Sequence, residues 1–118
     1  MTDASAEEQD VVAGRLRFGT GLAESERQGI IERLAGLGRR LLSYPGDAVE
    51  LRLSVKDRDT PQQRVTLECV LPGTEPLVAH SYEQDLPAAL VEVRDELIRR
   101  LDRLKTRRDP RRDHPHRP

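Results

Sequence analysis

The chain has no tryptophan, a single cysteine and few aromatic residues, and each shortage removes a class of function. One Phe and two Tyr make up the 3% aromatic content of its 118 residues. Because proteins that hold single-stranded nucleic acid usually stack bases on aromatic rings, base-stacking recognition is not expected. Cys69 has no second cysteine with which to form an internal disulfide or a thiolate metal site, which is typical of a reducing compartment.

Long apolar segments are missing as well. No stretch approaches the roughly 20 consecutive apolar residues that cross a membrane. The N-terminus carries Glu7, Glu8 and Asp10 where an export signal has basic residues followed by an apolar run. We therefore expect a cytoplasmic protein with no membrane partner. Its length and 36% hydrophobic content leave room for one domain with a modest aliphatic core.

Charge is nearly balanced over the whole chain but unevenly placed along it. The sequence has 20 Lys or Arg and 21 Asp or Glu, a net charge of −1. Residues 99–118 hold nine Arg or Lys against three Asp, a net charge of +6, so residues 1–98 carry −7. A basic end of this kind predicts an anionic partner.

The first third of the chain predicts an arm, a short strand and a helix. Residues 1–13 are small, polar and acidic without apolar periodicity, which predicts a disordered acidic arm. Alternation over residues 15–18 predicts a strand. The helix is expected to begin near Ser25, whose hydroxyl would cap it while Gln28 completes a capping box. Its buried stripe consists of Ile30, Leu34, Leu37 and Leu41.

Three further strands are expected in the middle of the chain. Residues 49–56 and 64–71 alternate apolar and polar side chains on either side of a turn at 57–62. This pattern predicts an antiparallel hairpin with one buried face and one exposed face. Residues 77–82 supply the last strand.

A long amphipathic helix ends the domain. Asp85 is expected to cap it, and its apolar stripe consists of Leu86, Leu90, Val93, Leu97, Leu101 and Leu104. Pro110 and Pro115 prevent further helix, so residues 109–118 are expected to be a disordered basic tail. The order of elements predicts an α+β domain over residues 14–108 with the arrangement β-α-β-β-β-α. Its four-stranded mixed sheet would have a parallel first pair and two helices on one face.

Motifs that carry catalytic or cofactor chemistry are not found. Gly19-Thr20-Gly21 lies between a strand and a helix, but the Gly-Lys-Ser/Thr of a phosphate loop does not follow. Asp57 and Asp59 fit turn chemistry better than a cation site, and no Cys or carboxylate is spaced with the histidines as a ligand set. Cys69 alternates with core positions, which predicts inert packing. We expect a non-enzymatic protein without cofactor, metal or small-molecule substrate.

The last strand and the start of the last helix consist of the run Leu77-Val78-Ala79-His80-Ser81-Tyr82-Glu83-Gln84-Asp85-Leu86-Pro87-Ala88-Ala89-Leu90. This run resembles the final strand and helix start of a known family, the ribosome hibernation-promoting factors, also called ribosome-associated inhibitors or sigma-54 modulation proteins. The family's helical leucines and cations fall at Val93, Leu97, Arg99, Leu101, Arg103, Lys105 and Arg107. The element order over residues 14–106 is similar to that of the family's N-terminal domain. The chain therefore resembles a short or divergent form.

The resemblance implies a translation regulator that binds the small ribosomal subunit at the decoding-centre channel and promotes hibernation under stress. The implied partners are the subunit and its rRNA, with a homodimer or a longer paralogue as further partners. Lys and Arg at the end of a helix neutralise backbone phosphates without reading bases, which agrees with this role. The candidate RNA-binding residues are Arg33, Arg39, Arg40, Arg99, Arg100, Arg103, Lys105, Arg107 and Arg108.

Two other hypotheses stay open. The acidity of residues 1–98 favours a divergent protein-interaction module of the same fold that does not bind ribosomes. Its basic tail would engage an acidic partner or the acidic face of another copy. The third hypothesis is a binder of double-stranded RNA with the tail as a nonspecific arm, and it would bind free duplex RNA as well as intact subunits.

Overall fold

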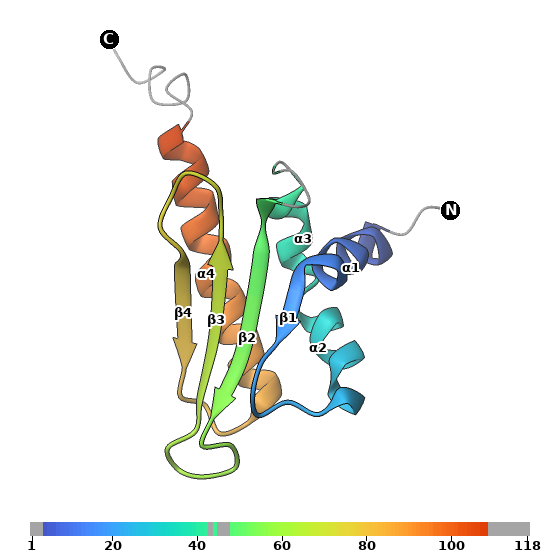
Figure 1. The fold of residues 1–118 in the computed structure, drawn as a ribbon, viewed down its shortest axis with the longest axis vertical. Helices are drawn as coiled ribbons and strands as arrows, with labels where there is room; N and C mark the ends of the chain where they lie inside the picture. Colours follow the sequence, from blue (N-terminus) through green and yellow to red (C-terminus); the bar gives the residue numbers. More distant parts are fainter. Residues whose placement is uncertain (1–3, 43, 45–47, 109–118) are drawn as a thin grey trace.

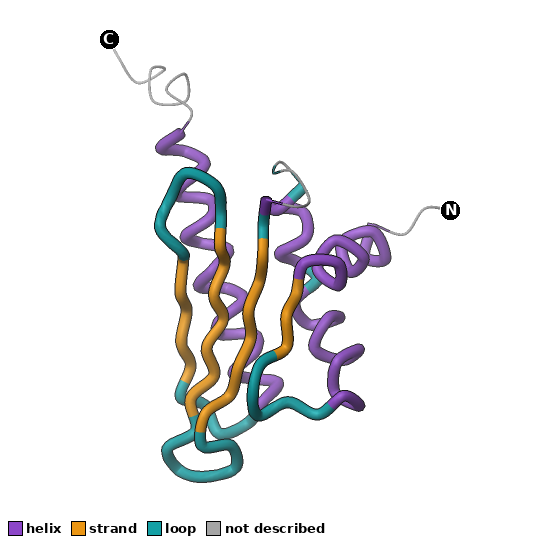
Figure 2. Tube along the Cα trace, viewed as in Figure 1, coloured by secondary structure: helices purple, strands orange, loops and turns teal. Residues whose placement is uncertain are grey.

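The computed structural model describes residues 4–42, 44 and 48–108, with the backbone alone for residues 4–6 and 106–108. A four-stranded sheet forms one layer and the helices form the other (Figure 1). In chain order the elements are α1 (Ala4–Arg15), β1 (Leu16–Phe18), the 3-10 turn η1 (Glu24–Glu26), α2 (Arg27–Leu34), α3 (Gly36–Leu41), β2 (Glu50–Lys56), β3 (Arg64–Val70), β4 (Leu77–Ser81) and α4 (Leu86–Arg108). Figure 2 shows how the loops join these elements at the two ends of the sheet.

The sheet has the predicted topology. Its strand order is β1-β2-β3-β4, with β1 parallel to β2 and the other neighbours antiparallel. In the hairpin, Leu53 lies opposite Leu67, and Ala79 of β4 lies opposite Leu67 on the other side. All three side chains are buried, because alternation turns every second residue of each strand toward the helices. The predicted α+β class and mixed sheet are confirmed.

The core lies between the sheet and the helices. Its largest fully buried side chains include Leu34, Leu37, Leu51, Leu67 and Leu97, which come from α2, α3, β2, β3 and α4. The helix α4 begins as predicted, because a side-chain oxygen of Asp85 accepts a hydrogen bond of 3.1 Å from the backbone N–H of Ala88. Burial of the predicted stripe therefore fixes α4 along the sheet.

The N-terminal segment differs from the prediction of a disordered arm over residues 1–13. Residues 4–15 form α1, and Val12 is fully buried. The carboxylate of Glu8 binds Arg39 of α3 at 3.1 Å. A Cβ atom at Gly38 would lie 2.5 Å from the carbonyl oxygen of Glu8, so glycine there allows the two helices to touch. The prediction was wrong because α1 depends on this tertiary contact and has little apolar periodicity of its own.

The single helix expected from Ser25 is divided into η1, α2 and α3. Ser25 lies inside η1 and does not cap a helix, since the backbone N–H of Ala23 donates instead to the carboxylate of Glu26 at 2.9 Å. At the break between α2 and α3, the N–H of Gly38 bonds the carbonyl of Ala35 at 2.8 Å, three residues back rather than four. Glycines weaken a helix, and the break falls among them. The predicted stripe is nevertheless buried.

The glycines of the loop after β1 are explained by close contacts with β2, without a role in phosphate binding. Gly19 N–H donates to the carbonyl of Leu53 at 2.7 Å, and Val55 N–H donates to the carbonyl of Thr20 at 2.9 Å, so the chain continues alongside β2. Gly21 has φ of +83°, and a Cβ atom there would lie 2.3 Å from the carbonyl oxygen of Val55. Both conditions require glycine at position 21. The predicted tail, residues 109–118, lies outside the described residues, as do residues 1–3.

Candidate nucleic-acid interface

Three of the candidate cations meet around one hollow at the C-terminal ends of α3 and α4. Arg39 and Arg40 come from α3, and Lys105 comes from α4. Together with Tyr44, Leu101 and Asp102 they line a depression of about 210 Å³. The sequence places Arg40 and Asp102 62 residues apart, so only the packing of α3 against α4 brings them together.

Two more candidates lie on the other side of α4, next to β4. Arg100 and Arg103 line a second depression of about 310 Å³, together with Thr74, Leu77, Glu96 and Leu104. Arg100 also donates a hydrogen bond of 2.8 Å to the carbonyl oxygen of Val78 in β4. Arg100 therefore helps to hold α4 on the sheet.

The other candidates do not join either group within the described side chains. Arg33 lines a hollow with Leu86 and Leu90, at the start of α4 and far along the helix from Lys105. Arg99 is exposed and binds Glu96 within its own helix. Arg107 and Arg108 fall within the bounds of α4, but their side chains lie outside the described residues. The predicted set is thus divided among several sides of the helical layer.

Acidic residues already contact four of the candidates. Glu8 binds Arg39 at 3.1 Å and Asp102 binds Arg40 at 3.3 Å. Glu96 binds both Arg99 and Arg100, whose hydrogen bonds lower the pKa of its carboxyl below the usual value. Surface pairs of this kind add little stability, so an incoming anion can displace the carboxylates at small cost. The sequence did not predict the pairs of Arg39 and Arg40, because Glu8 and Asp102 belong to other helices than the arginines that they contact.

Arg103 and Lys105 stand apart from the paired cations. Both side chains are exposed, and neither makes an ion pair or a hydrogen bond with the described residues. They also belong to the C-terminal half of α4, where the carbonyl end of the helix dipole favours positive charge. Within the described side chains, these two and Arg33 are the candidate cations that have no carboxylate to displace before they bind a phosphate.

The polar side chain of Ser81 and the thiol of Cys69 have structural roles. Ser81 donates a hydrogen bond to the carboxylate of Glu92 and accepts one from the N–H of Glu83, which joins β4 to α4. Burial raises the pKa of the Cys69 thiol to about 12, so the thiol is unreactive in the folded chain. Within the described residues, no three His, Cys, Asp or Glu side chains are placed to hold a metal ion.

Comparisons with known proteins leave the family open. Neither the models of known protein families nor the curated proteins match the chain. The resemblance to the hibernation-promoting factors therefore stays a hypothesis, based on residues 77–108 and on the order of the elements. In the described part of the chain, no helix is long and apolar enough to span a membrane.

Proposed function

We propose that the chain is a non-enzymatic translation regulator of the cytoplasm that binds the rRNA of the small ribosomal subunit and promotes hibernation under stress. The observation that carries the proposal is the convergence of Arg39, Arg40 and Lys105 around one hollow of about 210 Å³. Cations from two helices would meet the RNA at the same end of the molecule, and Arg103, on the side of α4 that faces β4, would make a separate contact. The decoding-centre channel follows from the family resemblance alone.

The chemistry of the interface would be phosphate neutralisation. Lys and Arg release counterions from RNA when they contact its backbone, and this supplies affinity without reading the sequence. A phosphate would replace Glu8 at Arg39 and Asp102 at Arg40, while Lys105 would bind with no carboxylate to displace. The affinity should therefore fall steeply with salt. For the three contacts of Arg39, Arg40 and Lys105 we expect a loss of roughly twenty- to fortyfold between about 50 and 200 mM salt.

Co-sedimentation with purified small ribosomal subunits tests the proposal. Charge reversal at Arg103 and Lys105 should reduce binding at low salt by at least about tenfold, since it replaces two attractions to phosphate with two repulsions. A control matched in charge is Arg17→Glu with Arg27→Glu, which reverses two exposed cations outside the candidate set and should change binding much less. Unchanged co-sedimentation of the Arg103→Glu, Lys105→Glu protein would refute the proposal.

A second function is favoured by the charge of the chain outside its basic end. Residues 1–98 carry a net charge of −7, which repels RNA and suits a protein-interaction module better. A protein-interaction module of the same fold would stay out of ribosomal fractions when stationary-phase lysates are sedimented. Binding to free duplex RNA as strong as binding to intact subunits would instead support the double-stranded-RNA hypothesis.

A further inference from the structure

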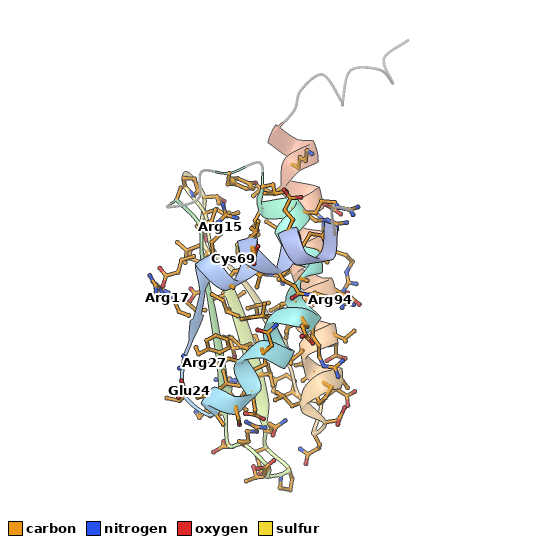
Figure 3. All side chains as sticks on the ribbon, turned by 90° about the vertical axis from the view of Figure 1, so that its right-hand side faces the viewer. Arg15, Arg17, Glu24, Arg27, Cys69 and Arg94 are labelled. Atoms are coloured by element: carbon orange, nitrogen blue, oxygen red, sulfur yellow. The ribbon has the colours of Figure 1, made fainter. Side chains whose placement is uncertain are left out.

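The face of the sheet opposite the helices is uncovered by any described element. In Figure 3 the helices lie on one side of the sheet, and the side chain of Arg17 points away from them. The register pairs Arg17 with Arg52 and Arg52 with Glu68, which places all three on this open face. Because side chains alternate along a strand, Ser54, Lys56, Arg64, Thr66 and His80 lie there too.

Charges on the open face are divided into two halves. Near β1, Glu50 lies 3.1 Å from Arg52 and 3.8 Å from Arg17, and Glu68 lies 3.6 Å from Arg52. Among the strand residues of the open face, the two carboxylates are therefore at one end, where they pair with Arg17 and Arg52. The positive charges of that half are therefore neutralised by carboxylates of the same face.

The other half has cations without such partners. Lys56 lies directly opposite Arg64 in the hairpin, and like charges in this position destabilise a sheet. Neither cation forms an ion pair or a side-chain hydrogen bond with the described residues, and the Nε atom of Arg64 is buried without a hydrogen-bond partner. A buried donor of this kind carries a free-energy penalty. The like-charge pair and the unsatisfied Nε atom of Arg64 therefore lie at the same end of the open face.

The next row of the same half consists of neutral polar groups. Ser54, Thr66 and His80 lie side by side across β2, β3 and β4. Thr66 Oγ1 and His80 Nδ1 are hydrogen-bonded at 3.0 Å, so the Nε2 atom of His80 is the ring nitrogen that can bond to a ligand. Arg, Lys, Ser and Thr side chains are the usual donors to nucleic-acid phosphates.

We propose that Ser54, Lys56, Arg64, Thr66 and His80 form a second binding surface, which holds the phosphate backbone of single-stranded RNA. This surface is independent of the proposed contact through α4, since it lies on the opposite layer of the fold. A phosphate between Lys56 and Arg64 would relieve their repulsion. His80 is the one side chain of the five with a ring on which a base could stack, and the other four contact only the backbone, so binding should depend little on sequence.

Fluorescence anisotropy of a labelled 20-nucleotide single-stranded RNA tests this surface in the full chain. The protein carries Arg103→Gln and Lys105→Gln throughout, which weakens the contact through α4 and leaves the rest of it the same in every protein compared. Adding Lys56→Gln and Arg64→Gln should weaken binding by about tenfold and reduce the slope of log affinity against log salt by about 1.4, the value for two lost contacts to a single strand. The matched control, Arg17→Gln with Arg52→Gln, removes the same charge from the paired half and should change affinity by less than about threefold.

Stability measurements separate binding from folding. Lys56→Gln with Arg64→Gln removes a like-charge pair, so its thermal midpoint should stay the same or rise while RNA binding falls. Arg64→Lys, with Lys56 intact, should restore most of the affinity. Equal RNA binding by the Lys56→Gln, Arg64→Gln protein and its parent would overturn the proposal. So would competition by polyglutamate as strong as competition by unlabelled RNA of equal charge, because the partner would then be an acidic protein.

Discussion

Single residues hold two loops together at one end of the sheet through a few polar contacts. Glu26, in the turn before α2, accepts hydrogen bonds from Arg58 at 2.7 and 2.5 Å and from the N–H of Ala23 at 2.9 Å. Arg58 also donates to the carbonyl of Gly21 at 2.7 Å. This cluster joins the β2–β3 turn to the loop that follows β1. It lowers the pKa of Glu26 to about 2, first through Arg58 and then through Ala23.

The depressed pKa predicts an acid-dependent loss of stability. The contribution of Glu26 is complete above its unfolded pKa of 4.5 and is lost as the pH falls through the folded pKa of about 2, at which half of the folded carboxylate is protonated. We expect Glu26→Gln to reduce the free energy of unfolding by about 1 to 2 kcal/mol at pH 7, and by much less at pH 2. Urea denaturation at both pH values measures the difference. Glu24→Gln, an exposed carboxylate in the same turn, is the control, and an equal effect of the two substitutions would contradict the prediction.

The buried thiol predicts slow labelling. Because burial raises the pKa of Cys69 to about 12, almost none of it is thiolate at neutral pH. A thiol reagent should therefore react with Cys69 only when the chain unfolds, at a rate that rises with urea. Labelling of the folded protein at the rate of a free thiol would show that Cys69 is accessible.

Sequence reasoning at this scale found the cations but not their partners. The sequence offered nine cations as one candidate set, and the structure places three of them, Arg39, Arg40 and Lys105, around one hollow. The carboxylates of Glu8 and Asp102 come from other helices, and no local spacing signals such a long-range pair. The alternation of polar and apolar residues predicted that the sheet has an exposed face. It did not predict that Lys56 lies opposite Arg64, because that pairing depends on the register of the hairpin.

At the scale of elements, the contact between α1 and α3 depends on one glycine. A Cβ atom at position 38 would lie 2.5 Å from the carbonyl oxygen of Glu8, a backbone atom that cannot move alone. The strand and α4 predictions were accurate because each of those elements has a strong pattern of its own. The helix α1 could not be predicted in this way, since its evidence in the sequence is spread over Val12, Glu8 and the distant Gly38.

Paired glycine substitutions test that contact. Gly38→Ala should lower the free energy of unfolding by about 1 to 3 kcal/mol, because the new methyl group pushes α1 away from α3. Gly29→Ala in α2 meets no atom within 4 Å, so it should raise stability by about 0.5 to 1 kcal/mol through helix propensity. Both are measured by urea denaturation. A stabilising Gly38→Ala would mean that α1 does not pack there.

At the scale of the whole molecule, one core extends from α1 through the sheet to α4. Val12, Leu37, Leu67 and Leu97 belong to the same buried cluster. Removing residues 1–13 should therefore lower the free energy of unfolding by about 2 kcal/mol or more, since it uncovers apolar surface that Val12 and its neighbours bury. Thermal denaturation of the shortened chain checks this, with Val12→Ala as a milder variant. Unchanged stability would support the disordered arm that the sequence predicted.

The whole molecule also has its two cationic surfaces on different layers. One lies where α3 and α4 end, and the other lies on the bare face of the sheet. The sequence predicted the first from the +6 charge of residues 99–118 but gave no sign of the second, because residues 1–98 are acidic overall. Net charge averaged along the chain hides a local cluster that folding creates from two strands.

The hydrogen bond from Arg100 to Val78 has a consequence for assembly. The strand β4 is at the edge of the sheet, and the carbonyl of Val78 points outward, where a strand from another molecule would otherwise bond to it. Outward backbone groups on an edge strand invite intermolecular pairing and aggregation. By occupying that carbonyl with a charged side chain, Arg100 helps to keep separate copies of the chain from joining their sheets.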